Sequence, residues 1–193
     1  MPTNRHFDLL APLYDRVMRA PDPTRLRSLL ELPVPGLLLD AGGGTGRLAR
    51  ALCGGAGRWV ICDLSLPMLR QAKGSWPGDC AVRLNLARAE RLPFPANRFD
   101  RIVVVDAFHH FADQPGAARE LARVLRPGGR LVIEEPDIRR PWVKLIALAE
   151  TLAGMGSRFR RGEEIAALLA AGGLRARAED DGNLTVWAIA EKE

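Results

Sequence analysis

The chain of 193 residues has few cysteines and no long apolar run. Without a stretch of about eighteen apolar residues it offers no transmembrane helix, and its first residues carry charges where a signal peptide needs an apolar core. The three cysteines, Cys53, Cys62 and Cys80, are odd in number and form no CxxC pair of the kind that binds zinc. We therefore expect a cytoplasmic protein with no metal site and with reduced thiols.

Long basic runs are also missing. The net charge is +5 and the pI is near 9.7, but no run exceeds two consecutive arginines. Scattered solvated charge accounts for this pattern better than a nucleic-acid surface does. We expect no nucleic-acid partner and no membrane span, and the sequence leaves the oligomeric state open.

Short apolar runs alternate with helical patterns along most of the chain. The runs read as buried strands, and they cover 36–40, 58–63, 80–86, 100–106 and 130–136. Helical patterns lie between most of them, over 46–52, 66–73 and 114–125. A Pro-Gly turn is expected at 126–129. Such alternation predicts an α/β fold with a parallel sheet covered on both faces.

The C-terminal part has a different pattern. A helix over 163–173 ends in glycines, and two alternating strands, 174–180 and 184–192, flank a turn at 181–183. This is the signal of an antiparallel hairpin. At this length we expect one domain, residues 1–193.

Glycines crowd the exit of the first strand, in the stretch LLLDAGGGTGRLA at 37–49. They let the chain turn sharply and let a ligand touch the backbone beside the free N–H groups of the next helix. Gly42, Gly44 and Gly46 fit GxGxG, whereas Arg47 excludes the pyrophosphate pattern GxGxxG. A P-loop is excluded because GK[ST] is missing. The stretch predicts a nucleotide-type ligand, and the alternative is a tight turn without one.

Four stretches taken together resemble a known family: LLLDAGGGTG, CDLS, ERLPFPANRFD and RELARVLRPGGRLVIEEP. The chain resembles the class I S-adenosylmethionine-dependent methyltransferases, and most of all the branch of ubiquinone and menaquinone biosynthesis methyltransferases. The resemblance implies a Rossmann-like, mostly parallel sheet in the order 3-2-1-4-5-7-6, with an antiparallel C-terminal hairpin and helices on both faces. It also implies capping helices within 1–35.

The resemblance implies S-adenosyl-L-methionine as cofactor and S-adenosyl-L-homocysteine as product. Asp63 would accept hydrogen bonds from the ribose, Asp40 would face the methionine end, and Leu64 and Met68 would flank the adenine. The cofactor residues that we expect are Tyr14, Asp40, Ala41, Gly42, Gly44, Gly46, Asp63, Leu64, Met68, Ala89, Glu90 and Asp106.

One position departs from the family pattern. The family places an acid and then an alanine before LPF, and here those positions are Arg88 and Ala89. Arginine cannot accept a hydrogen bond from the adenine amino group. Either Glu90 takes that role or the contact is lost.

The end of the fourth strand supplies the candidates for acid–base chemistry. Methyl transfer from a sulfonium needs alignment first, and it needs a base only when the acceptor must lose a proton. The stretch VVVDAFHHF places Asp106, His109 and His110 at the expected crevice. A histidine there could deprotonate a phenol or an enol. The alternative is that the histidines cap or support the next helix.

Residues 136–161 form an insertion that we expect to act as a lid. An apolar face at helical spacing lies between arginines, which suits an apolar or aromatic small-molecule acceptor with a polar head. For this segment, the alternative is a helix packed on the sheet. For the chain as a whole, the alternatives to a small-molecule methyltransferase are a nucleic-acid methyltransferase and a cofactor-binding protein without catalysis. The face consists of Trp142, Leu145, Ile146, Ala149 and Leu152, and the arginines are Arg139, Arg140, Arg158, Arg160 and Arg161.

Overall fold

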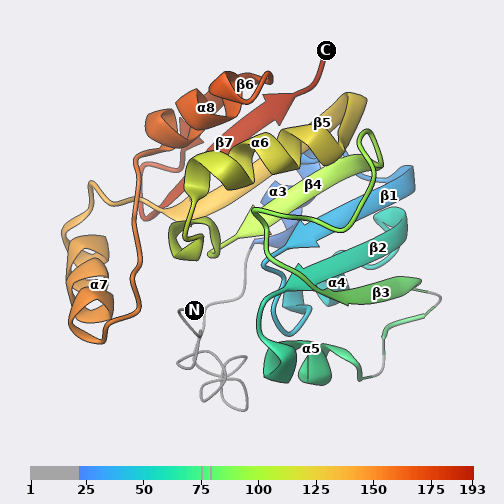
Figure 1. Ribbon diagram of the computed structural model, residues 1–193, viewed down its shortest axis with the longest axis horizontal. Helices are drawn as coiled ribbons and strands as arrows, with labels where there is room; N and C mark the ends of the chain where they lie inside the picture. The colour runs from blue at the N-terminus through green and yellow to red at the C-terminus, as the bar shows by residue number, and fades with distance from the viewer. Residues whose placement is uncertain (1–21, 75, 79) are drawn as a thin grey trace.

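The computed structural model describes residues 22–193, except 75 and 79 (Figure 1). Tyr14 and most of the expected N-terminal capping region therefore lie outside the described residues. What the structure shows of that region is α3, Pro23–Leu29, whose first turn is capped by the Asp22 carboxylate through the backbone N–H groups of Thr24 and Arg25.

The centre of the molecule is a seven-stranded sheet in the order β3-β2-β1-β4-β5-β7-β6. The first five strands pair in parallel, and β7 runs antiparallel to both β5 and β6. The predicted fold class, strand order and hairpin are confirmed. The strands are β1 Val34–Ala41, β2 Ala56–Asp63, β3 Val82–Leu86, β4 Phe99–Val105, β5 Leu125–Pro136, β6 Arg175–Asp180 and β7 Thr185–Glu191.

Helices cover both faces of the sheet (Figure 1). Neighbouring residues of β1 show the two sides, because Leu38 packs with α3, α4 and α5, whereas Leu39 packs with α6 and α8. No helix in the described part of the chain is long and apolar enough to cross a bilayer. The remaining helices are α4 Arg47–Ala51, α5 Leu66–Ala72, η2 Phe108–His110, α6 Gln114–Val124, α7 Pro141–Leu152 and α8 Gly162–Ala171.

The Pro-Gly stretch at 126–129 is part of an interrupted strand rather than a turn before one. Phe99 pairs with Leu125 and Arg101 pairs with Arg130, so several residues of β5 face a single residue of β4. The strand bulges there, with Gly128 at a φ of +71°. The end of the helix lies within one residue of the predicted position, whereas the strand begins at Leu125 rather than at residue 130.

The expectation of three reduced thiols is wrong for two of them. Cys53 and Cys80 form a disulfide, with their Cα atoms 5.6 Å apart, and Cys62 is a buried free cysteine. The loop after α4 and the segment before β3 meet on one side of the sheet. This pairing could not be predicted from the sequence, because the two cysteines are 27 positions apart.

The apolar face of α7 does not pack on the sheet. Trp142 is 72% exposed, Leu145, Ile146 and Leu152 are also exposed, and Val143 is the buried residue of the helix. Figure 1 shows α7 standing beside the sheet rather than over either of its faces. The alternative of an ordinary packed helix is therefore not what the structure shows.

Candidate functional site

A cavity of about 290 Å³ opens at the carboxyl ends of β1, β2 and β4. This is where α/β sheets place their ligands, since the loops from neighbouring strands diverge there. Its volume is at the lower end of the range for small-molecule sites. The predicted residues that line it are Ala41, Gly42, Gly44, Asp63, Leu64, Met68, Ala89, Glu90, Asp106 and His110.

The glycine loop after β1 brings bare backbone to the cavity wall. Gly42 has a φ of +81°, and a Cβ atom at this position would lie 2.6 Å from the Cβ atom of Ala107. The backbone N–H groups of Gly42 and Gly43 donate to the carbonyl of Cys62, at 2.7 and 3.2 Å. The loop is therefore fixed from both sides, and a side chain at position 42 would force the loops after β1 and β4 apart.

The Asp63 carboxylate is held in place at the rim of this loop. Its Oδ2 accepts a hydrogen bond from the backbone N–H of Gly44 at 2.9 Å, and its Oδ1 accepts one from the N–H of Ser65 at 2.7 Å. The carboxylate is therefore positioned by backbone N–H groups at the wall of the cavity.

Asp40 lies behind the cavity wall rather than on it. The residue is 2% exposed, and its Oδ2 has no hydrogen-bond partner among the residues that the structure describes. A Cβ atom at Gly43 would come within 2.6 Å of that oxygen, so the carboxylate sits directly against the loop. Burial, and then the charge of Asp63, raise the pKa of Asp40 to about 7, although Arg47 acts in the opposite direction.

Gly46 also stands away from the cavity. Its φ is +79°, and a Cβ atom there would lie 2.6 Å from the ring of Trp76. It begins α4 as the N-terminal cap. The third glycine of GxGxG therefore serves the strand-to-helix turn, whereas the first two face the cavity.

Arg88 and Glu90 form one edge of the cavity together. The Arg88 guanidinium lies 3.4 Å from both Glu90 oxygens, and Glu90 Oε1 also accepts from the N–H of Ala112 at 2.9 Å. Burial would raise the pKa of Glu90, but backbone hydrogen bonds and then Arg88 outweigh it and lower the pKa. Glu90 is therefore an ionised acceptor at the edge of the cavity. It lies two residues after Arg88, the position at which the family pattern has its acid.

A buried carboxylate organises the end of β4. Glu135 Oε1 accepts from the backbone N–H groups of Ala107 and Phe108, at 3.0 and 2.8 Å, and its Oε2 lies 2.5 Å from His109 Nδ1. Asp106, just before this turn, has a φ of +50°, a conformation that non-glycine residues rarely adopt. The Glu135 carboxylate therefore fixes the position of η2 and of both histidines.

The two histidines have different surroundings. His109 is buried behind the cavity and stacks on Phe159, with the ring centroids 4.2 Å apart. Burial lowers its pKa, but the charge and hydrogen bond of Glu135 more than reverse this and raise it. His110 lines the cavity, its Nδ1 lies 3.0 Å from Ser157 Oγ, and burial followed by the charge of His109 lowers its pKa to about 3.

Some residues of the site were not predicted from the sequence. Glu135 follows Glu134 at the end of β5, and an acidic pair at the carboxyl end of a buried strand is a signal that could have drawn attention to it. Met155 and Gly156 line the cavity from the segment after α7, together with Arg158, which was expected as one of the lid arginines. The exposed apolar face of α7 belongs to the same predicted insertion but does not line the cavity.

Part of the chain is similar in sequence to known proteins. A family model described as a methyltransferase domain matches residues 39–133. The ubiquinone/menaquinone biosynthesis C-methyltransferase UbiE of Hahella chejuensis is 38% identical over 105 residues, which is 51% of this chain and 42% of that protein. The match thus spans less than half of the length of this relative.

Solved structures show the same fold at low sequence identity. A putative methyltransferase from Bacillus halodurans has a TM-score of 0.76 at 18% identity, over 89% of this chain and 98% of that one. The [4+2]-cyclase SpnF has a TM-score of 0.77, also at 18% identity, over 98% and 94% of the two chains. The chain thus matches a methyltransferase domain over residues 39–133, and it has the strand order that the resemblance to the class I S-adenosylmethionine-dependent methyltransferases implies.

Proposed function

We propose that the chain transfers the methyl group of S-adenosylmethionine to a small-molecule acceptor. The observation that supports this most is that one cavity joins the glycine loop and Asp63 to Asp106 and His110. The name of the UbiE relative, a C-methyltransferase of quinone biosynthesis, also points to a small-molecule acceptor. The fold alone does not decide the reaction, since a [4+2]-cyclase shares it.

The cavity residues suit the groups of this cofactor. The Asp63 carboxylate would accept hydrogen bonds from the ribose hydroxyls, and Leu64 and Met68 would flank the adenine. Glu90 would accept a hydrogen bond from the adenine amino group, and the backbone N–H of Ala89 would donate one to the adenine ring. The buried Asp40 carboxyl, with one oxygen unpaired in the part of the molecule that is described, would face the cationic methionine end through the glycine loop, and that charge would favour its ionised form.

When bound, the cofactor supplies an activated methyl group, so the protein needs only to align and deprotonate the acceptor. His110 lines the cavity, and its lowered pKa keeps the imidazole neutral near pH 7. The same low pKa makes this imidazole a weak base, so its position beside the acceptor, rather than its basicity, would carry the deprotonation of a phenol or an enol. Met155, Gly156 and Arg158 close the acceptor side.

The first test measures the binding of S-adenosylhomocysteine and of NAD by calorimetry. We expect the first ligand to bind and NAD not to bind. Asp63→Ala should weaken binding at least tenfold, because charge-assisted hydrogen bonds contribute about 1.5 to 3 kcal/mol each. Asp181→Ala, on the distant hairpin loop, is the control. Unchanged affinity in Asp63→Ala would place the ribose elsewhere.

The second test follows stability against pH. The unfolded chain releases the Asp40 proton near pH 3.8 and the folded chain near pH 7, so the free energy of unfolding should fall as pH rises between these values. The full difference corresponds to about 4 kcal/mol. Urea unfolding should show the stability of Asp40→Asn relative to wild type rising with pH between about pH 4 and pH 7. Glu163→Gln, an exposed acid, is the control, and a gain that is independent of pH would refute the burial of an ionisable Asp40.

The third test separates the two histidines with hydroxylated aromatic acceptors. His110→Ala should lower turnover about a hundredfold or more without changing cofactor affinity, since a general base acts only on the acceptor. His109→Ala removes the partner of Glu135 and should lower the melting temperature instead. Equal, small losses of turnover in both variants would show that neither histidine is the base.

A further inference from the structure

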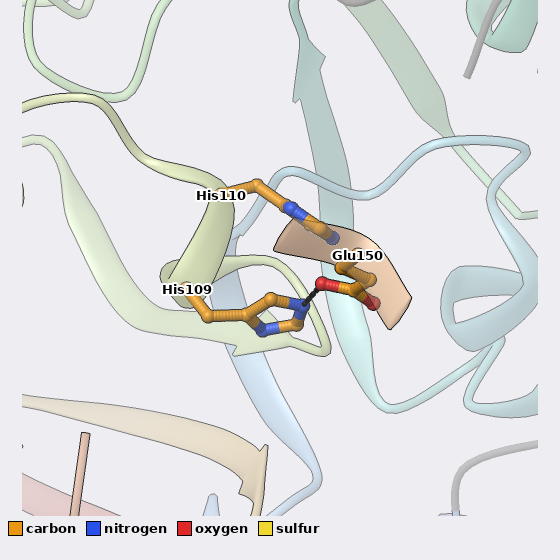
Figure 2. A group of neighbouring side chains, drawn as sticks. All are labelled: His109, His110 and Glu150. Carbon is orange, nitrogen blue, oxygen red and sulfur yellow. Dashed lines mark ion pairs between the residues drawn. The ribbon is translucent and has the colours of Figure 1, made fainter. Parts of the chain in front are cut away.

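We propose that His109, His110 and Glu150 bind a divalent transition-metal ion at the acceptor end of the cavity. The two histidines come from η2 and the glutamate from α7 (Figure 2). One donor atom of each residue lies within 4.8 Å of the others. Two nitrogen donors and one oxygen donor therefore lie close together, although they come from distant parts of the sequence.

The donors are spaced more widely than a hydrogen bond and more widely than the ligands of a bound ion. His109 Nε2 and Glu150 Oε2 are 3.9 Å apart, which is too long for a direct hydrogen bond. Ligands about 2.0 Å from a tetrahedral ion lie about 3.3 Å from one another. Binding of an ion would draw the three donors closer together, and Glu150 lies on α7, a helix whose side chains are mostly exposed.

One oxygen of the Glu150 carboxylate has no hydrogen-bond donor among the described residues. Its Oε2 is buried and accepts no hydrogen bond from any residue in the described ranges, 22–74, 76–78 and 80–193. A buried acceptor without a partner is costly, and a buried anion without one is more so. Figure 2 shows this carboxylate facing the rings of both histidines. A cation bound between the three side chains would satisfy it.

The far nitrogens of the two rings are already held. His109 Nδ1 lies 2.5 Å from Glu135 Oε2, and His110 Nδ1 lies 3.0 Å from Ser157 Oγ. Metal-binding histidines almost always make such a bond with the other ring nitrogen, because it fixes the tautomer and the orientation of the ring. The Glu135–His109 pair has the carboxylate–histidine arrangement that supports metal sites.

The donor set favours a particular class of ion. Two imidazoles and one carboxylate suit Zn²⁺, Co²⁺ or Fe²⁺ rather than Mg²⁺ or Ca²⁺, which prefer oxygen ligands. Three protein ligands leave a coordination position open. Because His110 lines the cavity, an ion held there would lie beside it and could lower the pKa of an acceptor hydroxyl. In that state the ion would replace His110 in activating the acceptor, since both ring nitrogens of His110 would be occupied. That last role rests on the proposed function, whereas the binding of the ion does not.

The experiment is a titration of the metal-free full chain with Co²⁺, without cofactor or acceptor. We expect saturation at one equivalent, with the visible absorption of four- or five-coordinate Co²⁺. Glu150→Gln and His110→Gln should each weaken binding at least tenfold, because each removes a ligand. Glu163→Gln, on the exposed face of α8, should bind as tightly as wild type.

Thermal unfolding with Zn²⁺ provides a second readout. The ion should raise the melting temperature of wild type and of Glu163→Gln but not of Glu150→Gln, and the three proteins should have the same circular dichroism without metal. No stoichiometric binding by wild type, or equally tight binding by Glu150→Gln, overturns the proposal. Since no methyl donor is present, either result leaves the proposed methyl transfer to be judged by its own tests.

Discussion

The site depends on the parallel pairing of β1 with β4 at the centre of the sheet. Residues 38–40 of β1 pair with 101–103 of β4, and the loops that follow the two strands then diverge. The Cα atom of Gly42 can approach Ala107 only because it carries no side chain. Because the loops after β1 and β4 approach so closely, they line one shared cavity. The proposed binding of the cofactor and of the acceptor depends on that cavity.

Charge adds a second constraint to this geometry. Asp40 and Asp63 are close enough for the charge of one to raise the pKa of the other, and such repulsion favours a ligand that carries positive charge. At the other end of the cavity, Glu135 is used within the protein, where it holds η2 and His109. Asp63 thus lies on the cavity wall with Asp40 buried behind it, whereas Glu135 shapes the end of β4.

The sequence was sufficient for the fold and for most of the cavity wall, because strand order and glycine spacing are local or family-wide signals. It was insufficient wherever two distant segments meet. The Cys53–Cys80 disulfide, the different positions of His109 and His110, and the meeting of Glu150 with η2 all depend on tertiary packing. The exposure of α7 has the same origin, since helical periodicity identifies an apolar face but not what covers it.

The most direct test of the account is a crystal structure of the chain with S-adenosylhomocysteine. The account predicts both ribose hydroxyls within hydrogen-bond distance of the Asp63 carboxylate, and the sulfur atom directed toward the part of the cavity that His110 lines. A ribose bound away from Asp63, or a sulfur atom directed away from His110, would contradict it.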